Sequence, residues 1–224
     1  MSEVQEESTY SAFPPEQISP LVEQISQLLQ SHNSTLSISE GSCGGLLSSY
    51  LVSQAGASKW YQGGTLIYSL NSRLKLNGWS QKEINEYTGP SERVALRLAR
   101  NLRIELGSEY VLSETGIAGG REYKNLTGIK EGGDVGTVFL AVSTPQGEFS
   151  KCVNTGVKER HVNMQLFAKL GLEFLLEVVK DVVAKSEDQK DFSDDDQHEE
   201  EEEDKEDLDQ QELSNNTKKV KLSD

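Results

Sequence analysis

A turn of small residues in this chain of 224 residues could carry nucleophilic or anion-binding chemistry. It reads Glu40-Gly41-Ser42-Cys43-Gly44-Gly45 and joins an alternating segment, residues 35–39, to an apolar run, residues 46–52. Small residues let a ligand approach the backbone, and the first N–H groups of a helix have no partner within it, so such a turn can hold a phosphate or an oxyanion. A Ser or Cys on the turn can attack a carbonyl group once a base removes its proton. The alternative is a tight strand-to-helix connection that Ser42 caps.

A second turn of the same kind follows a buried segment at residues 110–113. It reads Thr115-Gly116-Ile117-Ala118-Gly119-Gly120. In open α/β sheets, ligands gather outside the carboxyl ends of the strands. We therefore expect the two glycine-containing turns to line one crevice, and the alternative is that their glycines serve tight turns only.

The hydrophobic pattern predicts the elements that position these turns. Apolar residues recur at helical spacing in some segments and alternate or run together in others. We predict helices over residues 18–29, 46–52, 91–106 and 160–183, short helical turns ending near residue 77 and over 80–87, and strands over 35–39, 60–69, 110–113, 135–142 and 148–153. Helices that alternate with strands predict an α/β domain with a largely buried sheet.

The negative charge of the chain is concentrated at one end. Of the formal charge of −15, residues 187–224 contribute 17 acidic and 5 basic side chains, which leaves the rest of the chain at only −3. A segment with so few apolar residues and so much charge is expected to be disordered. We divide the chain into a disordered N-terminal segment (residues 1–15), an α/β domain (16–183) and a disordered acidic tail (184–224).

The composition also excludes several classes of protein. No run approaches the roughly 20 apolar residues that cross a bilayer, the polar N-terminus is unlike a signal or transit peptide, and the folded part lacks the basic excess of a nucleic-acid binder. Two cysteines, Cys43 and Cys152, build neither a disulfide framework nor a four-ligand zinc site. We predict no metal, no cofactor, no membrane or nucleic-acid partner, and a cytoplasmic location.

The tail contains a loose nuclear-localisation pattern, the run Lys218-Lys219-Val220-Lys221. This pattern makes the nucleus a second expected location. The alternative is a chance lysine cluster in a solubilising tail.

An ordered set of short motifs resembles the CinA C-terminal domain family over residues 16–182. That family typically shows A-E-S-C-T-G-G, G-x-x-x-Y-S-N-x-x-K, V-S-E, [ST]-G-I-A-G-P, V-G-T-V and G-x-R. The corresponding stretches occur here in the same order, at residues 39–45, 64–73, 90–92, 115–120, 135–138 and 156–158. The resemblance implies a three-layer α/β/α sandwich with a central mixed sheet, assembled as a homo-oligomer.

The resemblance also implies an activity and a set of site residues. Enzymes of the family hydrolyse the carboxamide of nicotinamide mononucleotide, giving nicotinate mononucleotide and ammonia, with a Ser of the first motif as nucleophile. Carried over to this chain, the motifs place the catalytic roles on Ser42, Tyr68 and Arg73. They place contacts to a small-molecule nucleotide on Gly44, Gly45, Thr115, Gly116, Gly119 and Lys158.

The chain departs from the family pattern at the reactive positions. Alignment without gaps puts Gly41 at the nucleophile position, whereas a one-residue shift puts Ser42 there, with Cys43 as a further candidate. Arg73 replaces the family's Lys, and a guanidinium cannot be deprotonated in a protein, so it cannot act as a general base. His161 is a chemically suitable base, or else a capping or surface residue.

Smaller departures affect the binding of the phosphate. Lys158 replaces the Arg of G-x-R, which keeps the positive charge but loses the bidentate geometry, and Gly120 replaces a Pro. The Arg farther along the family's last helix has no obvious counterpart, because Val162 and Asn163 occupy that region.

Three hypotheses follow from these residues. In the first, the chain is a pseudoenzyme that keeps a nucleotide-shaped pocket, has impaired amidase chemistry and acts in ligand binding or interaction. In the second, it is a working amidase with a rearranged centre, in which Ser42 attacks and Tyr68, Thr115 and Arg73 support it. In the third, the acidic tail is the functional part and binds a partner.

Overall fold

The computed structural model describes residues 12–120 and 134–187. The chain divides into two compact units, residues 1–180 and 181–224. In the second unit the structure describes residues 181–187, which are helical. Most of the predicted N-terminal segment and acidic tail, including the lysine pattern at 218–221, lies outside the described residues.

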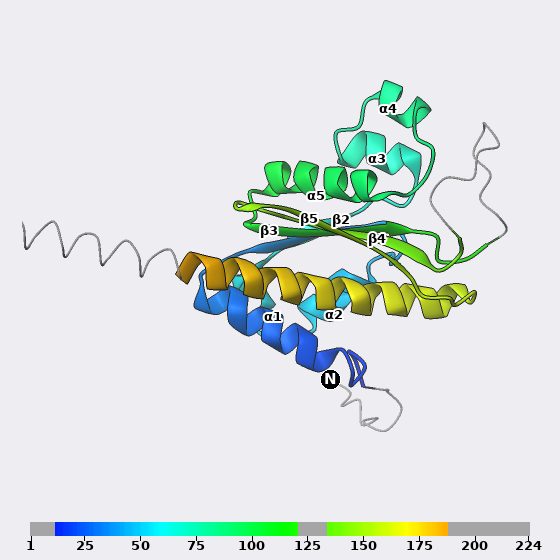
Figure 1. Cartoon of the computed structure of the whole chain (residues 1–224). Helices are drawn as coiled ribbons and strands as arrows, with labels where there is room; N and C mark the ends of the chain where they lie inside the picture. Colours follow the sequence, from blue (N-terminus) through cyan, green and yellow to red (C-terminus); the bar gives the residue numbers. More distant parts are fainter. Residues whose placement is uncertain (1–11, 121–133, 188–224) are drawn as a thin grey trace, which may run out of the picture. The chain divides into compact units, whose positions relative to one another are not determined.

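A five-stranded mixed sheet forms the centre of the first unit (Figure 1). Its strands run in the spatial order β2-β1-β3-β4-β5. Their bounds are Leu36–Glu40 for β1, Tyr61–Leu66 for β2, Tyr110–Gly116 for β3, Thr137–Thr144 for β4 and Gly147–Asn154 for β5. The strands β1, β2 and β3 are parallel, whereas β4 and β5 continue the sheet as an antiparallel hairpin. The predicted mixed sheet is confirmed.

Two strand ends differ from the prediction by three residues, each because of its pairing partner, and the remaining strand ends differ by two residues or fewer. The strand β3 extends three residues beyond Ser113, since Thr115 and Gly116 pair with Phe139 and Val138 of β4. The second glycine-containing turn therefore begins as part of the sheet. The strand β2 ends at Leu66, which is also the last residue paired with β1.

Helices cover both faces of the sheet (Figure 1). Their bounds are Ser19–Ser31 for α1, Leu46–Val52 for α2, Leu70–Leu76 for α3, Gln81–Asn85 for α4 and Glu92–Leu106 for α5, with a short 3₁₀ helix, η1, over Ala57–Lys59. A last helix covers residues 160–187. One face carries α5, with α3 and α4 beyond it, and the other carries α1, α2 and the part of the last helix that belongs to the first unit. The predicted three-layer sandwich is thus confirmed. None of the helices in the described part of the chain is long and apolar enough to span a membrane.

Apolar side chains fill the space between the sheet and both helical layers. On the α5 side, the buried Ala95, Ala99 and Leu102 pack against residues of β3 and β4. On the opposite side, Leu47 of α2 and Leu112 of β3 lie 3.5 Å from the place that a Cβ on Gly171 would take. Because apolar layers cover both faces, β1 is buried along its whole length.

The strand order places a crevice where the glycine-containing turns lie. The chain leaves β1 through α2 to reach β2 on one side, and it reaches β3, on the other side of β1, after α5. Because β1 and β3 are parallel, their carboxyl ends lie at the same edge of the sheet. Connections that diverge in this way leave a crevice outside the carboxyl ends of the two strands.

We predict that Gly116→Ala destabilises the domain, because an added Cβ would lie 2.5 Å from the Thr137 carbonyl oxygen and 2.9 Å from the Val138 Cα of β4. Over-packing of this kind lowers the free energy of unfolding by roughly 1–3 kcal/mol, which urea denaturation measures. Gly171→Ala is the matched control, since its nearest neighbours lie at 3.5 Å and Ala favours a helix over Gly by up to about 1 kcal/mol. Equal losses of stability in the two variants would contradict the close approach of β3 and β4.

Candidate functional site

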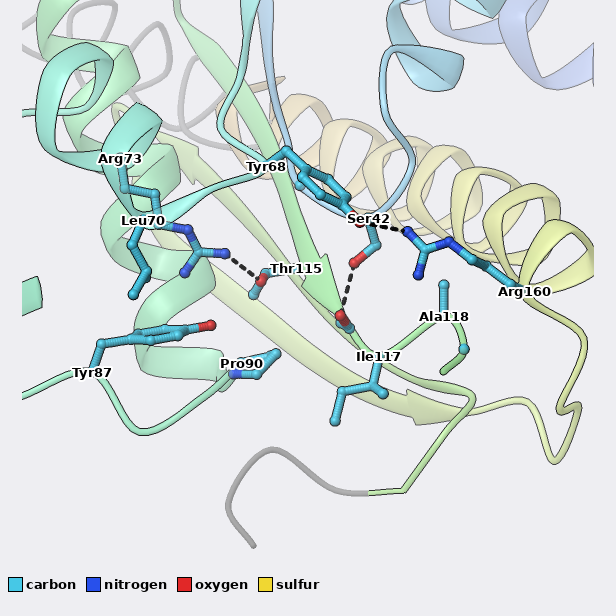
Figure 2. Close-up of a pocket in the computed structure, with 13 residues that line it drawn as sticks. Ser42, Tyr68, Leu70, Arg73, Tyr87, Pro90, Thr115, Ile117, Ala118 and Arg160 are labelled. Atoms are coloured by element: carbon cyan, nitrogen blue, oxygen red, sulfur yellow. Dashed lines mark hydrogen bonds between the residues drawn. The ribbon is translucent and has the colours of Figure 1, made fainter. Parts of the chain in front are cut away.

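A cavity of about 360 Å³ opens at the carboxyl ends of β1 and β3 (Figure 2). The first glycine-containing turn contributes Gly41 and Ser42 to its wall, and the second contributes residues 115–119. The two turns therefore line one crevice, as the sequence predicts. Further walls come from the segment around α3, which includes Tyr68 and Arg73.

The carboxylate of Glu40 holds the start of α2. Glu40 is the last residue of β1, is fully buried, and accepts hydrogen bonds from the N–H groups of Gly45, Leu47 and Ser48 at 2.8–3.1 Å. The Ser48 hydroxyl donates to it as well, at 2.6 Å. The N-cap residue Gly45 has no side chain to do this work, so a carboxylate five residues earlier caps the helix instead.

A second buried carboxylate, Glu114, holds the turn itself. Glu114 lies opposite Glu40 in the register of β1 and β3, and one of its oxygens accepts from the N–H groups of Gly41 at 2.8 Å and Cys43 at 2.6 Å. The other oxygen is buried and has no hydrogen-bond partner among the described residues. The pKa of Glu114 is raised to about 7: burial is the largest cause, the charge of Glu40 acts in the same direction, and the two N–H bonds oppose the shift.

These bonds change what the first turn can do. The N–H groups of five residues, at positions 41, 43, 45, 47 and 48, already donate to the two carboxylates. They are not available to a phosphate or an oxyanion, which corrects the expectation that this helix start offers free donors. Gly44 and Gly45 do not line the cavity, and their φ values of 66° and 101° show that the turn itself requires glycine there.

Ser42 presents its hydroxyl to the cavity (Figure 2). Its Oγ donates a 2.9 Å hydrogen bond to the carbonyl oxygen of Gly116. A carbonyl oxygen can accept this bond but cannot remove the proton, so the hydroxyl is not activated as a nucleophile in this arrangement. Of the two alignments, the structure shows that Ser42, and not the side-chain-free Gly41, can supply a hydroxyl here.

Cys43 is placed away from the cavity. Its side chain is buried and its Sγ lies 3.7 Å from the carbonyl oxygen of Met164. Burial raises the pKa of the Cys43 thiol well above its usual value, and the carboxylates of Glu114 and Glu40 raise it further. A protonated, enclosed thiol is a poor nucleophile, which argues against Cys43 in that role.

Arg73 brings a buried positive charge to one end of the cavity (Figure 2). Only 5% of its surface is exposed. Its Nη2 donates to Thr115 Oγ1 at 3.1 Å and its Nε to the Ile67 carbonyl at 3.4 Å. The guanidinium lies over the rings of Trp79 and Tyr87, 5.4 Å and 4.8 Å from their centres. Its Nη1 is buried without a hydrogen-bond partner in the part of the chain that the structure describes.

A second arginine, Arg160, lies at the other end of the cavity with Tyr68 (Figure 2). Its Nη2 donates to the Tyr68 hydroxyl at 3.0 Å, and its guanidinium lies 5.9 Å from the centre of that ring. The last helix begins close to the second turn, because Gly119 has no Cβ: one built there would lie 2.6 Å from the Cβ of Arg160. Gly119 therefore allows the close approach of the last helix to the second turn.

Sequence reasoning missed Arg160 and assigned its charge to Lys158. Lys158 is exposed and does not line the cavity, and His161 is exposed and does not line it either. Thr115, Gly116 and Gly119 do line it. One signal in the sequence could have indicated Arg160: it is a basic residue only two positions after Lys158. An insertion of two residues in the G-x-R motif would place it where the family has its Arg. Among the described residues, no group of three or more His, Cys, Asp or Glu side chains could hold a metal ion.

Comparison with known sequences identifies a family and several relatives of this chain. The family model described as "CinA C-terminal domain" matches residues 18–179. A "CinA-like protein" of Shewanella piezotolerans is 31% identical over 155 residues, which cover 69% of this chain and 35% of that protein. A "CinA-like protein" of Flavobacterium psychrophilum is 30% identical over 132 residues, covering 59% and 30%. The chain thus spans about a third of the length of these curated relatives.

Solved structures share the fold. A CinA superfamily protein of Escherichia coli superposes with a TM-score of 0.64 at 24% identity, over 72% of this chain and 90% of that one. The competence/damage inducible protein of Agrobacterium tumefaciens gives a TM-score of 0.65 at 22% identity, over 75% and 98%. The α/β sandwich with its five-stranded mixed sheet is therefore CinA-like.

We predict that Glu114 makes the domain less stable as the pH rises from about 4.5 to 7. The folded state holds the Glu114 proton up to pH of about 7, whereas the unfolded chain releases it near 4.5, so the folded state binds more protons in this window and its stability falls with rising pH. The loss amounts to roughly 3 kcal/mol. Urea denaturation at several pH values should show it in the wild type and in Glu105→Gln, an exposed control on α5, and a flatter profile in Glu114→Gln. Identical profiles for the wild type and Glu114→Gln would contradict the assignment.

Proposed function

The chain belongs to the CinA C-terminal domain family, and we propose that it binds a nucleotide-like anion in the cavity between the two turns without efficient amide hydrolysis. The observation that carries the proposal is the pairing of Ser42 with a backbone carbonyl, while an arginine occupies the place of the family's lysine.

The first requirement of amide hydrolysis, a base for the nucleophile, is not met by these residues. A Ser hydroxyl needs a neighbouring group that accepts its proton, and the best such group has a pKa near the working pH. The guanidinium of Arg73 stays charged and offers donors only. Glu114 has a suitable pKa of about 7, but it accepts from N–H groups of the first turn, whereas the Ser42 hydroxyl donates to a carbonyl oxygen. The Tyr68 hydroxyl is engaged by Arg160.

The second requirement, stabilisation of the tetrahedral oxyanion, is also weakened. One well-placed donor is worth about 3–4 kcal/mol in such reactions. In this turn the N–H groups of Gly41 and Cys43, which flank Ser42, point to Glu114. A transition state at Ser42 would lack these two donors.

The size and the lining of the cavity, in contrast, favour the binding of a nucleotide. A volume of about 360 Å³ lies within the usual range of small-molecule pockets, roughly 300–1,000 Å³. Leu70, Tyr87 and Pro90 give the wall an apolar part suited to a flat ring, and two arginines supply positive charge. An anionic nucleotide with an aromatic base, such as nicotinamide mononucleotide, matches this combination. The placement of the Ser42 hydroxyl on the wall favours a working amidase as the second candidate.

We expect nicotinamide mononucleotide to raise the unfolding temperature without being consumed. A ligand that binds only the folded state at about 100 times its Kd adds about 2.7 kcal/mol, or roughly 5–10 °C for a domain of this size. Ammonia release in the same solution should equal that of the nucleotide alone, and Ser42→Ala should keep the thermal shift. Ammonia release that Ser42→Ala abolishes would establish the amidase instead, and neither a shift nor ammonia would contradict both.

A further inference from the structure

We infer that the Arg73 end of the cavity selects a carboxylate over the matching carboxamide, so that the preferred ligand is the acid form of an aromatic nucleotide. This inference rests on the proposed function, because it specifies which form of the nucleotide the cavity takes.

The first step is that Arg73 is a buried cation without a counter-ion among the described residues. None of the ion pairs within residues 12–120 and 134–187 involves Arg73. Its Nε and Nη2 donate to neutral oxygens, and Nη1 has no partner among the same residues. A buried charge is costly unless it is paired and hydrogen-bonded. A ligand that supplies an anion here relieves that cost.

The two buried carboxylates near the cavity do not take this role. Both oxygens of Glu40 and one oxygen of Glu114 accept from N–H groups of the first turn and of α2. The other Glu114 oxygen has no hydrogen-bond partner among the described residues, so it does not accept from Arg73 either. No carboxylate among residues 12–120 and 134–187 pairs with Arg73, and we therefore assign the anion to the ligand.

The second step is the difference between an acid and its amide. A carboxylate presents two acceptor oxygens and a negative charge to a guanidinium, whose donors match it in geometry. A carboxamide presents one acceptor and an NH₂ group, which is itself a donor and has nothing to gain from Nη1. Charge-assisted hydrogen bonds are also about twice as strong as neutral ones.

The third step assigns the two ends of the ligand. Around Arg73 lie Leu70, Tyr87 and Pro90 (Figure 2), and the guanidinium stacks over aromatic rings, which suits a flat ring bearing a carboxylate. Arg160 lies at the opposite end and is exposed. An exposed cation suits a phosphate that keeps part of its hydration. The cavity thus fits a ligand with an aromatic carboxylate at one end and a phosphate at the other.

The test is calorimetric titration of the whole chain at pH 7.5 with nicotinate mononucleotide and, separately, nicotinamide mononucleotide. We expect the acid to bind about 10- to 100-fold more tightly, which corresponds to one hydrogen bond to a charged group. Free nicotinate and inorganic phosphate are titrated as well, to separate the two ends. Arg73→Gln should abolish the preference for the acid, whereas Arg160→Gln should weaken both nucleotides and keep their ratio.

Two further variants test whether a change in binding reflects a loss of folding. Arg100→Gln is the matched control, since Arg100 pairs with Glu148 on the surface and does not line the cavity, and it should bind like the wild type. Arg73→Lys keeps the charge and should keep part of the preference, which makes the test informative even if Arg73→Gln does not fold.

The outcomes separate the two proposals. Equal affinities of the wild type for acid and amide would overturn this inference and leave the proposed function standing. Binding of neither nucleotide would overturn the proposed function. A preference for the acid that survives in a folded Arg73→Gln would show that another group reads the carboxylate, and would overturn the assignment to Arg73.

Discussion

Two buried carboxylates, side by side at the ends of adjacent parallel strands, hold the centre of this site. Glu40 and Glu114 are register partners on β1 and β3, and together they accept five N–H groups of the turn and helix that follow β1. Burying two acids is costly, and hydrogen bonds to three of their four oxygens offset part of that cost. The position of Ser42 and the start of α2 both depend on this arrangement.

The same bonds that order the turn also limit its chemistry. A glycine-rich turn before a helix is an anion site only while its N–H groups are free, and here most of them serve the protein's own carboxylates. The positive charge at the cavity comes instead from side chains on other elements, Arg73 on α3 and Arg160 on the last helix. The crevice is therefore lined by charged side chains and does not offer a backbone cradle for an anion.

The two arginines meet different surroundings, and this gives the cavity a direction. Arg73 is enclosed by aromatic rings and neutral oxygens, whereas Arg160 is exposed and reaches the cavity because Gly119 allows the last helix to begin close by. Between these ends, the Ser42 hydroxyl donates a hydrogen bond to the Gly116 carbonyl oxygen on the cavity wall. In the function that we propose, this arrangement would orient a ligand that carries unlike groups at its two ends.

The sequence by itself determined the elements and their order, because helical and alternating spacing are local properties. It also predicted that the two turns meet, since parallel strands bring their carboxyl ends to one edge. It could not show that Glu114 accepts the N–H of Cys43, 71 residues away, that Ser42 donates to a carbonyl 74 residues away, or that Arg160 meets Tyr68 across 92 residues. These contacts depend on how the packed layers bring distant segments to within a few ångströms, and only the tertiary structure decided them.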